Sequence, residues 1–126
     1  MPVEVSSHPS LPILIAVYSG VLTSEEYRAM RAQRDDLLAQ FEGPVVVLAD
    51  MRALEAFPDA RQAERYAGVF ASARLRAVAI VLGERRYRVL MPALLPNGER
   101  HYTVKFFDDV DAALAYAEKV SAQTEV

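Results

Sequence analysis

The chain has no cysteine, which excludes disulfide bonds and thiolate chemistry. It also has no long hydrophobic run, because the longest apolar stretch, residues 11–18, is too short to cross a bilayer. The N-terminus carries no basic segment of the kind that opens a signal sequence. We therefore expect a cytoplasmic location and no insertion into membranes.

Motifs that hold cofactors or mark catalytic centres are also missing. The sequence contains no Gly-x-Gly-x-x-Gly, no phosphate-binding loop and no Gly-x-Ser-x-Gly around a serine. His8 and His101 are the only histidines, and neither stands at metal-ligand spacing from other ligand residues. We predict no cofactor, no metal site and no catalytic residue.

What is present fits one globular domain that spans residues 1–126. The formal net charge is −3, which gives no electrostatic reason to expect nucleic-acid binding. Of the 14 basic residues only Lys105 and Lys119 are lysines. A GC-rich genome explains this preference for arginine better than a functional need for guanidinium groups.

Five segments have the apolar, β-branched composition of strands. They cover residues 3–7, 13–19, 45–49, 77–82 and 102–107. Gly20 is expected to end the second strand, and Asp50 to end the third. The first two strands flank a turn-rich stretch, residues 8–12, and form a hairpin.

Helices separate the later strands. Thr23-Ser-Glu-Glu26 is a capping box that starts a helix, which Gly43 and Pro44 stop. Asp59 caps a second helix, residues 59–71, and Asp108 caps the last. Residues 84–95 fit a short helix, although Pro92 interrupts the pattern and Asn97-Gly98 fits a hairpin turn instead.

This order of elements predicts the fold class. Buried strands that alternate with helices require crossover connections, so the chain is an α/β protein with a mostly parallel sheet. The N-terminal hairpin adds an antiparallel edge, which makes the five-stranded sheet mixed.

Four segments resemble the STAS (anti-sigma-factor antagonist-like) domain, and in particular its bacterial STAS/CRAL-TRIO-like branch. They are residues 18–27, where a strand passes into a helix, the strand end at 45–52, the strand at 76–81, and the strand-to-helix passage at 105–114. The resemblance implies a SpoIIAA-like fold with helices chiefly on one face of the sheet. It also implies a regulatory protein that binds other proteins.

The resemblance also shows where the chain departs from the family. In partner-switching STAS proteins, a serine at the start of the helix after the second long strand is phosphorylated. The corresponding residues 55–61, Glu-Ala-Phe-Pro-Asp-Ala-Arg, contain no serine, threonine or tyrosine. The usual phosphorylation switch is therefore absent, and Asp59 either supplies a constant negative charge there or serves only as a helix cap.

The candidate partner-binding residues lie around the end of the third strand. Asp50 stands at the carboxyl end of a strand, where open α/β sheets place their ligand crevices, although it could simply satisfy loop amides. Apolar residues in the expected loop at 51–57 form an interface or fold back over the sheet edge. The predicted set is Asp50, Met51, Arg52, Leu54, Phe57 and Asp59. Arg85 and Arg88 are a separate candidate pair for binding an anion, with a solvated surface as the alternative.

The function that follows is a non-catalytic regulatory or protein-interaction module, with another protein or a second copy of the chain as its partner. The alternative is a small carrier of an apolar, lipid-like ligand, which the CRAL-TRIO relationship suggests. An enzyme ranks below both, because the sequence offers no pair of nucleophile and base.

Overall fold

The computed structural model describes residues 3–21, 23–56, 75–82 and 103–122. They form five strands and two helices: β1 (Val3–Ser7), β2 (Ile13–Val21), α1 (Ser24–Leu38), β3 (Val45–Ala56), β4 (Leu75–Val81), β5 (Thr103–Phe107) and α4 (Val110–Ala122). The predicted elements at 59–71 and 84–95, and Asn97-Gly98, lie outside the described residues. Among the described residues, no helix has the length and apolarity needed to cross a membrane.

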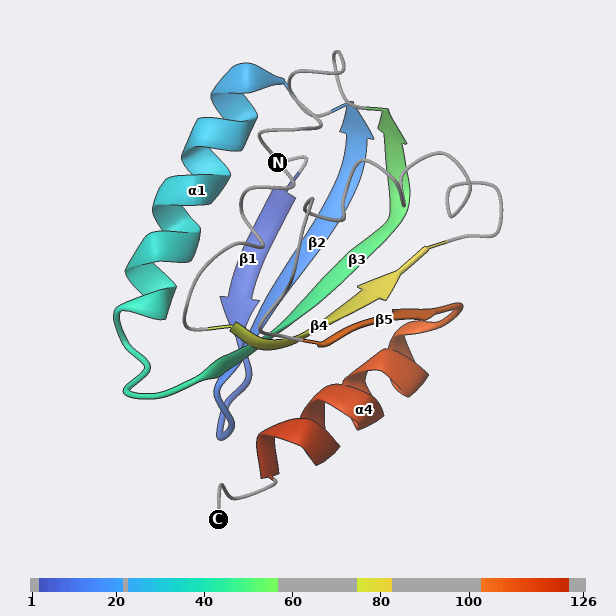
Figure 1. Ribbon diagram of the computed structural model, residues 1–126. Coiled ribbons are helices and arrows are strands. Elements are labelled where there is room, and N and C mark those ends of the chain that lie inside the picture. Colours follow the sequence, from blue (N-terminus) through green and yellow to red (C-terminus); the bar gives the residue numbers. More distant parts are fainter. Residues whose placement is uncertain (1–2, 22, 57–74, 83–102, 123–126) are drawn as a thin grey trace.

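The strands form one mixed sheet in the order β1-β2-β3-β4-β5 (Figure 1). The β1–β2 hairpin is antiparallel, and the three remaining pairs are parallel. The central strands are apolar on both faces because a parallel sheet is covered on both sides. The predicted α/β fold class is confirmed.

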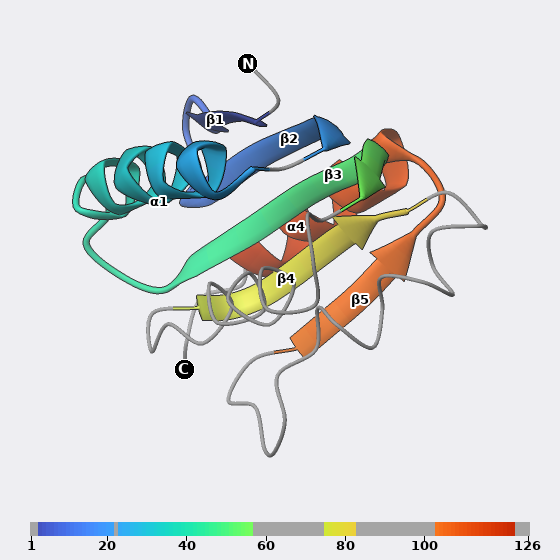
Figure 2. The same cartoon turned by 90° about the horizontal axis from the view of Figure 1, so that it is seen from above.

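The two described helices cover opposite faces of this sheet (Figure 2). On one face, Met30, Leu37 and Leu38 of α1 pack against alternate residues of the strands. On the other face, Ala113 and Ala117 of α4 have no exposed surface and pack mainly over β3 and β4. Because two predicted helical segments lie outside the described residues, the expected concentration of helices on one face remains a prediction.

Local signals in the sequence explain where both helices begin. Thr23 and Glu26 form the predicted capping box: the Glu26 amide donates to Thr23 Oγ1 at 3.2 Å, and the Glu26 carboxylate accepts from the Thr23 amide. The start of α4 differs from the prediction by one residue. Asp109, and not Asp108, caps it, because the Ala112 amide donates to Asp109 Oδ1 at 2.8 Å.

The third strand is much longer than predicted. Residues 51–56, which we expected to form a loop, continue β3 and pair in parallel with β2 as far as Val21 and Ala56. Register shifts interrupt this pairing on either side of Ser19 and Gly20. Gly20 does not end β2 as expected; its φ of +66° lies in the left-handed region that glycine adopts readily, so the strand bends there and continues.

Candidate functional site

The candidate site lies where β2 and β3 run side by side towards their carboxyl ends. Val17 of β2 is the register partner of Asp50 of β3. Side chains alternate between the faces of a strand, so Asp50 shares a face with Val46 and Leu48, which pack with the residues of α4. The site therefore belongs to the α4 face of the sheet.

Asp50 and Arg52 form a bidentate ion pair at this position. Arg52 Nε donates to Asp50 Oδ1 at 2.9 Å, and an Arg52 terminal nitrogen donates to Oδ2 at 3.0 Å. The backbone amide of Arg52 also donates to Oδ1, at 3.2 Å. The Asp50 side chain is 11% exposed and that of Arg52 is 49% exposed. The pair satisfies a nearly buried carboxylate and leaves half of the guanidinium side chain facing solvent.

Two carboxylates at the start of α4 interact electrostatically with Arg52. The hydrogen bonds and charge of Asp50 raise the pKa of Arg52, and Asp109 and Asp111 raise it further. Arg52 is therefore a permanent cation in locally acidic surroundings, and the described residues around it carry more negative than positive charge.

An exposed apolar side chain lies beside this ion pair. Val17 is 41% exposed, and no other large hydrophobic residue is exposed among those whose side chains the structure describes. Its register partner on the other side is Glu4 of β1. The exposed apolar side chain of Val17 therefore lies next to the partly exposed Asp50–Arg52 ion pair. Protein interfaces combine apolar and arginine side chains in this way.

The structure corrects the predicted role of Met51. Met51 was expected in a loop, where it would either form an interface or fold back over the sheet edge. It instead lies within β3, is 0% exposed and belongs to the core on the α1 face. Of the other predicted residues, Leu54 lies in β3. Phe57, Asp59, Arg85 and Arg88 lie outside the described residues. The structure thus brings together Asp50 and Arg52 from the predicted set and adds Val17, which the sequence did not single out.

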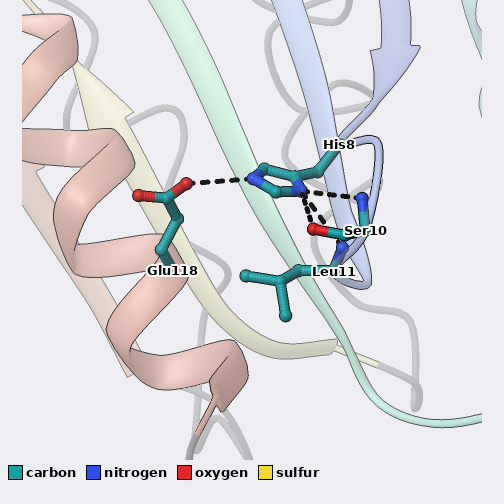
Figure 3. A network of polar contacts seen from close by, with 4 residues as sticks. All are labelled: His8, Ser10, Leu11 and Glu118. Atoms are coloured by element: carbon teal, nitrogen blue, oxygen red, sulfur yellow. Dashed lines mark hydrogen bonds and ion pairs between the residues drawn. The ribbon is translucent and has the colours of Figure 1, made fainter.

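A second polar cluster, which the sequence did not predict, links the β1–β2 turn to α4 (Figure 3). His8 Nε2 lies 2.9 Å from Glu118 Oε2, and His8 Nδ1 accepts from the amides of Ser10 and Leu11 at 3.1 and 3.0 Å. The turn-rich composition of residues 8–12 signals the local half of this cluster. No sequence signal indicates Glu118, which lies 110 positions away.

The cluster has the residue types of a hydrolytic triad, but its geometry does not support catalysis. Ser10 Oγ lies 3.4 Å from His8 Nδ1, a long contact. The two backbone amides already occupy that nitrogen, so it is unprotonated but not available as a general base. The His8 Nε2–H group therefore donates a hydrogen bond to the Glu118 carboxylate. The role of the cluster is to hold the β1–β2 turn against α4.

Among the described residues, no group of three or more ligand side chains could hold a metal ion.

None of the curated proteins compared with this chain matches it. The family model described as SpoIIAA-like matches residues 13–118. A crystal structure of an uncharacterized protein with a SpoIIAA-like fold from Shewanella loihica PV-4 is similar in fold, with a TM-score of 0.68 and 24% identity over 91% of each chain.

Proposed function

This chain belongs to the SpoIIAA-like family, and from that premise we propose that it is a non-catalytic regulatory module that binds a protein partner through the surface around Val17, Asp50 and Arg52. The observation that carries the proposal is the exposed Val17 beside the half-exposed Arg52. Arginine is enriched at protein interfaces, where its guanidinium group donates directed hydrogen bonds, and the exposed Val17 adds an apolar contact beside it.

The charges at this surface suggest the chemistry of the partner. Asp109 and Asp111 at the start of α4 and Glu4 beside Val17 are exposed carboxylates, whereas Asp50 is already paired with Arg52. A partner surface with a small apolar contact and surrounding basic residues would complement this pattern. A second copy of the chain would bring like charges together, so we favour a different protein over a homodimer.

The sequence supports binding without a phosphorylation switch of the usual kind. Residues 55–61 offer no hydroxyl group to a kinase, so the sequence lacks the phosphorylation site of partner-switching STAS proteins. The lack of a free base in the His8 cluster also supports a role other than catalysis. We therefore propose that the protein binds its partner constitutively, with an affinity that phosphorylation of this segment does not regulate.

Val17→Arg tests this proposal. The larger charged side chain would block an apolar contact, yet the exposed position and the neighbouring carboxylates should keep the free energy of unfolding within about 0.5 kcal/mol of the original chain. The measurement is quantitative co-purification of the tagged protein from its source cells. Gln33→Arg, at an exposed position on α1, is the matched control.

We expect one protein to co-purify in fixed ratio with the original chain and with the Gln33→Arg variant, and to be lost with Val17→Arg. Equal retention by both variants would reject the proposed surface. If size-exclusion chromatography shows that only a second copy dissociates, the binding surface stands and the homodimer replaces the foreign partner.

A further inference from the structure

A cavity of about 410 Å³ opens between α4 and the strands β4 and β5, away from the Arg52 surface. It is lined by Arg76, Ala77, Thr103, Lys105, Tyr116, Lys119 and Val120. Three of these side chains are cations, two carry hydroxyl groups, and none of the described residues that line the cavity is acidic. The volume falls within the range of sites that hold small molecules.

The concentration of positive charge contrasts with the rest of the chain. The protein has a net charge of −3, and its only two lysines, Lys105 and Lys119, both line this cavity. A genome bias towards arginine does not explain why both exceptions lie at one place. The three cations among the described lining residues generate a positive potential that attracts anions.

Local structure holds one of the cations in position. The rings of Phe107 and Tyr116 are 5.3 Å apart, and Lys105 Nζ lies 5.2 Å from the Tyr116 centroid and 5.8 Å from that of Phe107. These cation–π contacts restrict the ammonium group before any ligand arrives, which lowers the entropic cost of binding. Lys119 also complements the negative end of the α4 dipole, but that role requires neither Lys105 nor Arg76.

From this geometry we propose that the cavity binds a small phosphate monoester. Two lysines and two hydroxyl groups of the lining can donate hydrogen bonds to a ligand, and Arg76 adds positive charge. A phosphate monoester presents three strong acceptor oxygens and nearly two negative charges. A single carboxylate carries only one negative charge and two acceptor oxygens, so it complements this cationic lining less well. The apolar atoms of Ala77 and Val120 leave room for the organic part of the ester. The site is independent of the partner surface, so either proposal can fail alone.

The test is a calorimetric titration of the full chain with phenyl phosphate. We expect saturable binding that weakens with added salt and falls at least about tenfold in Lys105→Gln and in Lys119→Gln, since each variant removes a charge-assisted hydrogen bond. Arg28→Gln is the matched control, because Arg28 is exposed and the substitution makes the same change in net charge on α1, on the opposite face of the sheet. Its affinity should equal that of the original chain.

Two further measurements sharpen the result. Tyr116→Phe keeps the ring beside Lys105 and removes only the hydroxyl group, so it should weaken binding by a few fold without changing the melting temperature. Vesicles of phosphatidylcholine with and without phosphatidic acid distinguish a soluble ester from a lipid headgroup. Absence of binding to both probes, or an equal loss of affinity in Arg28→Gln, would overturn the proposal.

Discussion

Two neighbouring residues of β3, Asp50 and Met51, lie on opposite faces of the sheet. Asp50 and Met51 are adjacent in the chain, yet the carboxylate of Asp50 faces α4 and its arginine partner, whereas Met51 is 0% exposed in the core on the α1 face. The alternation of side chains along a strand explains the difference. Met51 therefore contributes to stability, and the binding surface is built from the residues on either side of it.

Met51→Ala tests this assignment. The truncation should lower the free energy of unfolding by about 2–4 kcal/mol, because it removes a fully buried side chain and leaves a cavity. Met51→Leu, which keeps the volume, should cost less than about 1.5 kcal/mol. Urea unfolding measures both. If the alanine variant were as stable as the original chain, Met51 would not be a core residue.

At the scale of elements, capping decides where α4 begins. Two aspartates precede it, but only Asp109 is in reach of a free amide of the first turn, that of Ala112. The sequence pattern predicts a cap here without distinguishing the two residues, because either side chain suits the role.

Substitution of each aspartate separates them. Asp109→Ala should lower the free energy of unfolding by about 1 kcal/mol, since the Ala112 amide loses its acceptor. Asp108→Ala should stay within about 0.5 kcal/mol of the original chain. Thermal unfolding followed by circular dichroism provides the comparison, and a larger loss for Asp108→Ala would mean that the predicted cap was right after all.

These elements also show how far sequence reasoning reaches. The capping box at Thr23 and the hydrophobic strand at residues 45–49 are local patterns, and the structure confirms both. The second half of β3 carries Asp50 and Arg52 and therefore resembled a loop, whereas its pairing with β2 makes it a strand. Val17 and the His8–Glu118 contact depend on residues brought together only by the fold, so no local pattern indicates them.

At the scale of the whole molecule, α4 separates two surfaces of opposite charge. Its start places Asp109 and Asp111 near Arg52, whereas Lys119 near its end lines the basic cavity. An exposed apolar residue, Val17, accompanies only the first of these surfaces among the described residues. This division supports a protein partner at one place and a small anion at the other.

The central claim, that the Val17 surface is where a partner binds, is tested most directly by photo-crosslinking in the source cells. A photoreactive benzoylphenylalanine placed at position 17 should give one cross-linked protein whose yield saturates. The same group at position 33 of α1 should give none. Mass spectrometry of the product identifies the partner. A similar spread of weak products from both positions, or a discrete product from position 33 alone, would contradict the account.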